Sequence, residues 1–322
     1  MDDRLEKLND ACPANYFDKE NGILLYQGDC LEVLSVLAEV LPQSLNCIVT
    51  DPPYGIAYVS NHRTDKDILG QAIANDKNLD VLKIVVPMLD KLLAQNSAAY
   101  FFAHPNMIGE NRLIFDPYWT YKNTLVWDKG DAGTFGDLEA AYSLNYESVF
   151  YYNKGRRKLN GSRPRTILRY DYNNPLIRDG SEVPYDEYLS VIENLLFELS
   201  EDKKEEVISL LPDDIVQLAL ARYPKSRLRK DWSARNDPVH PTVKPVNLMA
   251  LLIKYSTNEG DLVIDPFMGS GPVGAACKKL GRKFIGIELH PKFFTTAVER
   301  VKHGDAFISK TPRPPEIQKD LF

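Results

Sequence analysis

Short runs of apolar, β-forming residues recur along the chain and alternate with longer segments of helical spacing. The short runs are almost continuously hydrophobic, which is typical of strands buried on both faces of a parallel sheet. Strands that alternate with helices predict a doubly wound, mostly parallel α/β sheet. The predicted strands are 23–27, 46–50, 98–102, 123–127, 147–152, 262–265 and 283–287, and the predicted helices are 30–40, 77–95, 244–257, 272–280 and 291–302.

The pattern changes in the second half of the chain. Residues 185–222 have helical spacing without a strand, and Pro212 interrupts them, which predicts a small helical insertion. Beyond residue 305 the chain becomes polar and rich in proline, which predicts an extended tail. A length of 322 residues favours one large domain with an insertion. We therefore predict a first α/β part at 1–155, an insertion at 156–236, a second α/β part at 237–305 and a tail at 306–322.

Charge is distributed unevenly along the chain. The net charge of −6 is an average, and a nucleic-acid-binding face needs only a local excess of basic residues. Residues 154–169 include seven basic residues and no acid, and residues 222–235 include six basic residues and one acid. Residues 171–214, between them, have thirteen acids against three bases. A single charge run is often only a solvent-exposed face. Two basic blocks on either side of an acidic segment favour DNA contact instead. The residues we predict to contact DNA are Arg156, Arg157, Lys158, Arg163, Arg165, Arg227, Arg229 and Lys230.

Neither a membrane span nor a metal site is predicted. No apolar run approaches the roughly 20 residues that cross a bilayer, and the charged N-terminus is unlike a signal peptide. The cytoplasm is therefore the expected location. The cysteines lack the close spacing of zinc sites, so we expect no metal and reduced, mostly buried thiols. They are Cys12, Cys30, Cys47 and Cys277.

A glycine-rich turn follows the predicted strand 262–265. Gly269, Gly271 and Gly274 fit the spacing GxGxxG between a strand and a helix. Glycines there let a ligand approach backbone N–H groups at a helix N-terminus. Glu288 ends the next strand, nineteen residues after Gly269, where a carboxylate accepts hydrogen bonds from both ribose hydroxyls. The pattern indicates a cofactor that contains adenosine, and alone it fits a dinucleotide enzyme almost equally well.

The tetrapeptide Asp51-Pro52-Pro53-Tyr54 follows the predicted strand 46–50. The prolines stiffen the turn and have no N–H of their own, which leaves a carboxylate, free carbonyls and an aromatic ring at the ligand-binding edge of the sheet. That set suits an exocyclic amine on a planar ring, since Asp51 accepts one N–H, the Pro52 carbonyl accepts the other, and Tyr54 stacks on the ring. A base in duplex DNA must be flipped out to reach such a pocket. For the tetrapeptide taken alone, a purely structural turn is the alternative.

With both motifs present, the sequence resembles the amino-directed DNA methyltransferases of the DNA N4/N6-methylase family. The motif order, with the tetrapeptide first and the glycine loop last, is similar to that of the family's β class. The resemblance covers roughly residues 22–155 and 237–303. The matching pieces are LLYQGDCLEVL (24–34), NCIVTDPPYGI (46–56), LVWDK (125–129), NYESVFYYNKG (145–155), HPTVKPVNLMALLIKYSTNEGDLVIDPFMGSG (240–271) and KKLGRKFIGIELHP (278–291).

The resemblance implies methyl transfer from S-adenosylmethionine to a base of double-stranded DNA, with Asp51 to Tyr54 as the catalytic residues. An aspartate at the first catalytic position resembles the adenine-N6 enzymes, whereas a serine there resembles the cytosine-N4 enzymes, which remain the alternative. The implied cofactor residues are Asp29 at the adenine, Glu288 at the ribose, Thr242 and Lys244 at the methionine carboxylate, and Asp265, Phe267, Gly269 and Gly271 along the rest of the site.

The chain departs from the family pattern directly after Gly271, where Pro272 and Val273 replace the usual two threonines. This removes two hydroxyl donors and leaves the glycine turn itself unchanged. Residues 156–236 match no motif, and in this family such a variable stretch recognises the target sequence.

Other protein classes share part of these features. A nicotinamide dehydrogenase has the glycine loop but no need of the tetrapeptide. A protein-glutamine methyltransferase also uses a PPY motif, but its cofactor loop comes first in the chain. A non-catalytic DNA-binding module would have the basic blocks without intact cofactor residues.

Two further expectations concern partners. The end of the chain, Gln318 to Phe322, resembles the short peptides by which bacterial proteins bind the sliding clamp, with Leu321 and Phe322 as anchors. A frayed apolar terminus is the alternative. A homodimer is implied only by the family resemblance.

Overall fold

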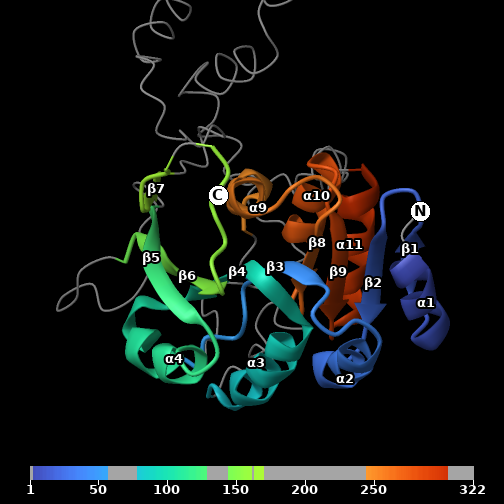
Figure 1. Ribbon diagram of the computed structural model, residues 1–322, viewed down its shortest axis with the longest axis horizontal. Coiled ribbons are helices and arrows are strands. Elements are labelled where there is room, and N and C mark those ends of the chain that lie inside the picture. The colour runs from blue at the N-terminus through green and yellow to red at the C-terminus, as the bar shows by residue number, and fades with distance from the viewer. Residues whose placement is uncertain (1–2, 57–77, 129–143, 162, 170–243, 304–322) are drawn as a thin grey trace, which may run out of the picture.

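The computed structural model describes residues 3–56, 78–128, 144–161, 163–169 and 244–303, and these form a nine-stranded sheet between two layers of helices (Figure 1). The strand order is β1-β2-β9-β8-β3-β4-β6-β5-β7. Five of the eight pairings are parallel, and β1–β2, β4–β6 and β6–β5 are antiparallel. The predicted fold class is confirmed. The strands are β1 Tyr16–Asp18, β2 Ile23–Gln27, β3 Leu45–Thr50, β4 Leu93–Ala103, β5 Thr120–Asp128, β6 Tyr146–Lys154, β7 Ile167–Arg169, β8 Leu262–Asp265 and β9 Lys283–Glu288.

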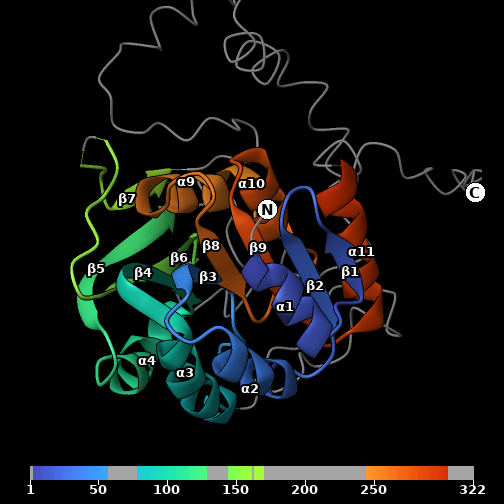
Figure 2. The same ribbon diagram turned by 45° about the vertical axis from the view of Figure 1, so that its right-hand side comes forward.

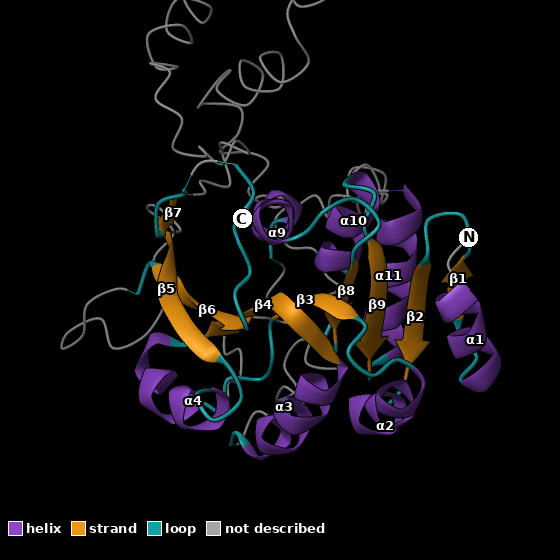
Figure 3. Cartoon of the chain, viewed as in Figure 1, coloured by secondary structure: helices purple, strands orange, loops and turns teal. Residues whose placement is uncertain are grey.

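The helices divide between the two faces of the sheet (Figures 2 and 3). One face carries α1 Asp3–Ala11, α2 Cys30–Val40, α3 Asp80–Leu92 and α4 Ile108–Phe115, the last preceded by the short 3-10 helix η1 Pro105–Met107. The other face carries α9 Val246–Ser256, α10 Pro272–Lys279 and α11 Pro291–His303. No helix in the described residues is long and apolar enough to cross a membrane.

Alternate side chains of each central strand enter different cores, which explains the continuous hydrophobicity of these strands. In β2, Leu24 packs among α1 to α4, whereas its neighbour Leu25 packs among α9 to α11. In β3, Ile48 joins the first core and Val49 the second, and all four side chains are fully buried.

The carboxyl ends of the parallel strands meet at one edge of the sheet, which we call the carboxyl edge. There, β3 ends at Thr50, β8 at Asp265 and β9 at Glu288. The antiparallel β6 begins at this same edge, because Ser148 pairs with Ala103 at the end of β4. Both sequence motifs therefore lie at the carboxyl edge.

Several boundaries differ from the sequence expectation. The helix predicted at 77–95 ends at Leu92, because β4 begins at Leu93 with a register irregularity and Asn96 has a positive φ. The strand predicted at 147–152 extends to 146–154. The sequence pattern does not predict α1, β1, α4 or β7. Residues 185–222, Thr242, Arg227, Arg229, Lys230 and Gln318 to Phe322 lie outside the described residues.

Candidate active site at the carboxyl edge

A hydrogen bond joins the ends of β3 and β8. The Thr50 hydroxyl Oγ1 donates to Asp265 Oδ1 at 2.7 Å, and both residues are buried. The same carboxylate oxygen accepts the backbone N–H of Phe267 at 3.0 Å. Asp51 directly follows Thr50, and the glycine turn directly follows Phe267. The bond therefore fastens the predicted catalytic turn to the predicted cofactor loop, across 215 residues of chain.

Asp51 lies in a cluster of four polar side chains that come from three separate segments. Lys244 Nζ donates to Asp51 Oδ2 at 2.6 Å and lies 3.2 Å from Glu147 Oε2. The Tyr54 hydroxyl donates to Asp51 Oδ1 at 2.7 Å and contacts Glu147 Oε2 at 3.0 Å. The side chain of Lys244 is only 5% exposed, that of Glu147 13% and that of Asp51 23%. We call Asp51, Tyr54, Glu147 and Lys244 the carboxylate–lysine cluster.

Apolar and aromatic groups surround the lysine. Its Nζ lies 5.4 Å from the ring centre of Phe102 and 6.0 Å from that of Trp127, and both side chains are buried. The ring of Tyr54 lies tilted beside His104, with 6.5 Å between the ring centres. Pro52 is buried and Pro53 partly buried. The cluster thus occupies a poorly hydrated site, where electrostatic interactions are stronger than in water.

Burial and like charge control the protonation of the cluster. Burial raises the pKa of Asp51, and the Glu147 carboxylate raises it further, although Lys244 opposes both effects. Burial alone would lower the pKa of Lys244, but the two carboxylates outweigh it and the pKa is raised, so the lysine stays charged. The pKa of Tyr54 is raised well above its usual value by burial and by the two carboxylates. The cluster therefore holds a neutral phenol and one ammonium between two carboxyl groups.

Neither sequence motif includes Glu147. It stands at the start of the buried strand β6, within the piece NYESVFYYNKG that matched the family pattern. An acidic residue at the head of an otherwise apolar strand was the available signal, since a charge there needs a partner. Only the fold reveals that partner to be Lys244.

The glycine turn has the geometry expected of a ligand loop. Gly269 and Gly271 have φ values of +53° and +78°, which other L residues rarely adopt. A Cβ on Gly271 would lie 2.8 Å from the Cβ of Ala297 in α11. The hydroxyl oxygen of Ser270 is buried and has no hydrogen-bond partner within the described part of the chain. The closely packed backbone of this turn and the buried Ser270 hydroxyl are typical of a loop that binds a polar ligand.

Glu288 is held at the rim of this loop. Its Oε2 accepts the backbone N–H of Gly269 at 2.9 Å, and its Oε1 accepts that of His290 at 2.8 Å. The adjacent Gly28 donates its N–H to the Glu288 carbonyl at 3.0 Å, which brings the Gly28–Asp29 turn alongside. Asp29 caps α2 by accepting the N–H of Leu31 at 2.9 Å. Asp29, Glu288 and the glycine turn are thus neighbours, as a single adenosine site requires.

Both acids of the loop resist ionisation. Burial raises the pKa of Asp265 to about 7, against the hydrogen bonds from Thr50 and Phe267, which lower it. Burial also raises the pKa of Glu288, although backbone N–H groups oppose the change. Buried acids with perturbed pKa values are common at functional sites.

Lys244 had been assigned to the methionine carboxylate of the cofactor. In the structure its ammonium group contacts the protein's own carboxylates, Asp51 and Glu147. The cofactor role stays a prediction. Thr242, its expected companion, lies outside the described residues.

The basic residues of the 154–169 block do not gather at one place. β6 ends at Lys154, which pairs with Ser97 near the start of β4. Arg156, Arg157 and Lys158 therefore follow at the opposite edge of the sheet, away from the carboxyl edge. At about 3.3 Å per residue, the stretch of β6 from Glu147 to Lys154 separates this edge from Glu147 by roughly 23 Å. The exposed Arg163 and Arg165 lead instead into β7, which runs parallel to β5 toward the carboxyl edge.

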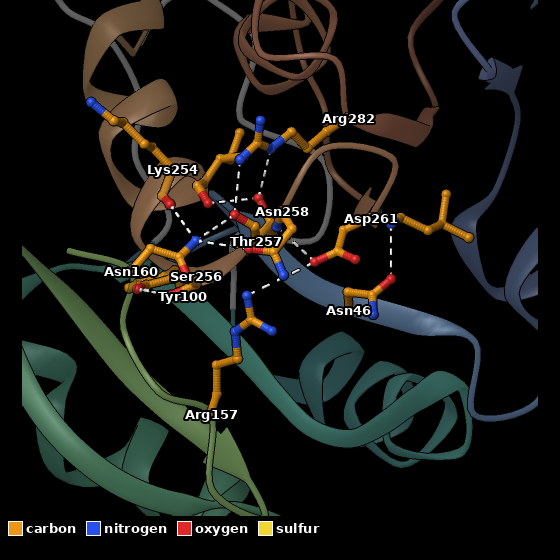
Figure 4. Close-up of polar contacts among 12 residues, drawn as sticks. Asn46, Tyr100, Arg157, Asn160, Lys254, Ser256, Thr257, Asn258, Asp261 and Arg282 are labelled. Carbon is orange, nitrogen blue, oxygen red and sulfur yellow. Dashed lines mark hydrogen bonds and ion pairs between the residues drawn. The ribbon is translucent and has the colours of Figure 1, made fainter.

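Arg157 takes part in a polar network at that opposite edge (Figure 4). Its Nη2 lies 3.9 Å from Asp261 Oδ2, and the arginine side chain is only 17% exposed. Nearby, the Asn160 side chain donates to the carbonyls of Lys254 and Thr257 at the end of α9. These contacts indicate that Arg157 helps to anchor the segment after β6.

Comparison with known proteins adds the deciding observation. Residues 45–299 match the DNA methylase family, a range that includes the tetrapeptide, β6, Lys244 and the glycine turn. The chain belongs to the DNA methylase family. The resemblance drawn from its motifs is confirmed.

Two relatives and two solved structures illustrate the likeness. The type II methyltransferase M2.LlaDCHI of Lactococcus lactis subsp. cremoris is 25% identical, over 91% of this chain and 93% of its own. The DNA adenine methyltransferase YhdJ of Escherichia coli K12 is 24% identical, over 97% of this chain and 98% of its own. The crystal structure of the M1.HpyAVI–SAM complex superposes with a TM-score of 0.52 at 22% identity, over 87% of this chain and 98% of that one. The cytosine-N4-specific PvuII DNA methyltransferase gives a TM-score of 0.54 at 16% identity, over 89% and 90%. This DNA methylase thus shares its fold with a cytosine-N4-specific enzyme, and one of its sequence relatives is named an adenine methyltransferase.

Proposed function

We propose that this DNA methylase transfers a methyl group from S-adenosylmethionine to N6 of an adenine that is flipped out of double-stranded DNA. The observation that carries the proposal is the Thr50–Asp265 hydrogen bond, because it holds the Asp51 turn beside the glycine loop. The aspartate at the first catalytic position and the adenine specificity named for YhdJ support adenine as the target.

Asp51 serves as the acceptor for the target amine. Its two oxygens already accept the Tyr54 hydroxyl and the Lys244 ammonium, but a carboxylate has about four acceptor positions and retains room for an amine N–H. The Pro52 carbonyl accepts the second N–H. These bonds draw the nitrogen lone pair out of conjugation with the ring and orient it for attack.

The amine nitrogen forms the new N–C bond with its lone pair, and the electrons of the broken C–S bond remain on sulfur. The nitrogen, then positively charged, loses one proton. Asp51 accepts that proton and releases it to water, and its raised pKa suits it as an acceptor. None of these steps requires a covalent intermediate on the protein.

The cofactor loop fits S-adenosylmethionine. Asp29 and Glu288 would hold the adenosine, and Asp265, Phe267, Gly269 and Gly271 would line the remainder. The strongest support is the tight glycine turn with its buried Ser270 hydroxyl, which has no hydrogen-bond partner in the described part of the chain. When bound, S-adenosylmethionine supplies an electrophilic methyl group on a positively charged sulfur.

Cytosine N4 is the alternative target. An exocyclic amine on cytosine presents the same two N–H donors to Asp51 and Pro52. Methylated DNA should be digested to nucleosides and analysed by mass spectrometry. N6-methyladenine is the expected product, and N4-methylcytosine would reject the adenine assignment.

The substitution Asp51→Ala tests the catalytic assignment. We expect methylation to fall by at least about 100-fold, as when a group that stabilises the transition state is lost, while cofactor affinity measured by calorimetry stays nearly unchanged. Asp10→Ala removes an exposed carboxylate from α1 and should leave both quantities unaltered. Normal turnover by the Asp51 variant would refute the assignment.

Further proposals concern DNA contact, location and partners. We propose that Arg163 and Arg165 contribute to DNA contact, that the 156–236 segment, apart from Arg157, contributes to target recognition, and that the enzyme acts in the cytoplasm. Family resemblance suggests a homodimer, which sedimentation would test. Deletion of Gln318 to Phe322 should abolish binding to a sliding clamp, and unchanged binding would dismiss that role.

A further inference from the structure

Glu147 is the member of the carboxylate–lysine cluster that neither motif contains. It enters from β6, whereas Asp51 and Tyr54 come from the turn after β3 and Lys244 precedes α9. One oxygen of Glu147 lies 3.0 Å from the Tyr54 hydroxyl and 3.2 Å from Lys244 Nζ. Glu147 therefore touches both groups that bind Asp51.

The cluster holds one ammonium and two carboxyl groups, so its charges cancel only when one carboxyl group is protonated. Lys244 contributes one positive charge, and Asp51 and Glu147 contribute one negative charge each, which leaves a net charge of about −1 in a buried site when both carboxyl groups are ionised. If Glu147 were neutral, Lys244 would balance Asp51 and the net charge would be zero. The second carboxylate thus keeps the lysine from neutralising the first.

This excess charge lies where the proposed reaction creates a cation. The target amine is neutral when it binds to Asp51 and is positively charged once the N–C bond has formed. A fixed negative charge in a site of low polarity stabilises the positively charged nitrogen more than the neutral amine. The transition state is therefore stabilised more than the bound substrate, which accelerates the reaction.

We propose that Glu147 is a positioning residue for methyl transfer, which holds Tyr54 and Lys244 against Asp51 and supplies the net negative charge that favours the cationic amine. The proposal rests on the proposed function, because it requires an amine at Asp51. It adds a residue from β6 to the catalytic arrangement.

The substitution Glu147→Gln removes the charge and keeps the size and the acceptor oxygen for Tyr54. We expect kcat to fall on the order of 100-fold, the effect of one unit charge a few ångströms away at intermediate polarity. The KM values for DNA and for S-adenosylmethionine should change by less than about 3-fold, since the lost interaction strengthens only during the reaction. Glu110→Gln, an exposed acid on α4, is the matched control and should behave as the wild type.

A second variant separates charge from shape. Glu147→Asp keeps the charge but shortens the side chain, so it should retain at least about 10-fold more activity than Glu147→Gln. Equal losses in the two variants, or a wild-type kcat in Glu147→Gln, would overturn the proposal. If Glu147→Gln fails to fold, wild-type-like kcat in Glu147→Asp supports the proposal and complete loss of kcat in a folded Glu147→Asp contradicts it.

A titration gives a readout that needs no methylation. Glu147 raises the pKa of Asp51, so Glu147→Gln should move the titration midpoint of the Asp51 carboxyl carbon, followed by NMR, to lower pH. The signal can be assigned by its absence from Asp51→Asn. The acid limb of the kcat profile should move in the same direction. The other titratable groups near the cluster are the same in both proteins: Tyr54, His104, Asp128, Lys244 and Asp265.

The two readouts distinguish failure of this proposal from failure of the proposed function. A wild-type enzyme that methylates no amine in DNA would refute the function, whatever the titration shows. An Asp51 midpoint that does not move in Glu147→Gln would refute the charge coupling, even in an active enzyme.

Discussion

Thr50 and Asp265 are 215 residues apart in the chain and are joined side chain to side chain at 2.7 Å. Each is the last residue of its strand, and β3 and β8 are neighbours in the parallel sheet. The residue after Thr50 is Asp51, and the turn after Asp265 holds the glycines. Together with the β3–β8 pairing, this hydrogen bond holds the proposed amine acceptor close to the proposed cofactor loop.

Removing that bond should weaken both stability and cofactor binding. Thr50→Val keeps the shape of the side chain but leaves the buried Asp265 carboxyl without its hydroxyl donor. We expect the free energy of unfolding to fall by about 1–3 kcal/mol, the usual effect of leaving a buried acceptor unsatisfied. Urea unfolding measures the loss, and calorimetry measures cofactor affinity. Thr120→Val, at an exposed site of β5, is the control, and an equal loss in the two variants would argue against the role of the bond.

Asp265 should make stability depend on pH near neutrality. Its pKa is raised to about 7 in the folded protein, so the folded state binds more protons than the unfolded state between about pH 4 and 7. Its contribution is therefore fully present at low pH and is lost as the pH rises through 7. Asp265→Asn keeps the acceptor oxygen but does not ionise. Its free energy of unfolding should therefore rise relative to that of the wild type as the pH increases from 5 to 8, by at most about 4 kcal/mol. A difference in unfolding free energy that stays constant over that range would contradict the prediction.

Lys244 should be required for stability as well as for chemistry. Lys244→Met leaves Asp51 and Glu147 as buried like charges, and removing one partner of a buried ion pair costs about 3–5 kcal/mol. The double variant Lys244→Met, Glu147→Gln removes the repulsion and should recover part of that loss. Chemical denaturation of the four proteins of this cycle measures the coupling. Strictly additive losses would mean that the two side chains do not interact.

Gly271 should be sensitive to any side chain. Both Gly271→Ala and Gly260→Ala place alanine at a φ of +78°, so both should lose about 1 kcal/mol from backbone strain. Only Gly271→Ala also brings a methyl group within 2.8 Å of Ala297, whereas nothing lies within 4 Å of a Cβ at Gly260. We expect a further loss of about 1–3 kcal/mol and weaker cofactor binding at Gly271 alone. Urea unfolding and calorimetry would show whether the two variants differ.

Two arginines of the basic block should behave differently. Arg157 lies next to Asp261 at the edge away from the active site, so Arg157→Ala should lower stability by about 1 kcal/mol and leave DNA affinity unchanged. Arg165→Ala should instead reduce DNA affinity and lower the slope of log affinity against log salt concentration by about 1. Fluorescence anisotropy over a salt series measures both. A reduced salt slope in Arg157→Ala would restore the original DNA-contact assignment.

Strong periodicity explains what could be predicted of the fold. The helix at Cys30–Val40 was predicted with its observed bounds, because its apolar residues recur at helical spacing behind the capping Asp29. The short strand β7 has only three residues, too few to show a period, and depends on pairing with β5. The helix α4 exposes Leu113 almost fully, so its apolar residues do not define one face.

The candidate site was predicted less completely than the fold. The tetrapeptide and the glycine turn are local patterns, and parallel strands bring their ends to one edge. Glu147 could not be assigned in this way, because its role depends on β6 running opposite to β4. For Lys244, the sequence identifies an ammonium group that needs a carboxylate. It does not say whether the ligand or the chain supplies that carboxylate.

The position of Glu147 depends on strand pairing rather than on a loop. Asp51 directly follows β3 and Asp265 is the last residue of β8, but Glu147 lies inside the β5–β6 ladder, directly opposite Trp127. Side chains alternate along a strand, so a shift of one residue would point Glu147 into the other core and present Ser148 to Lys244. On the role proposed for Glu147, a single-residue deletion or insertion within β6 would abolish methylation, so this part of the chain tolerates a change of length only outside the residues that pair β5 with β6.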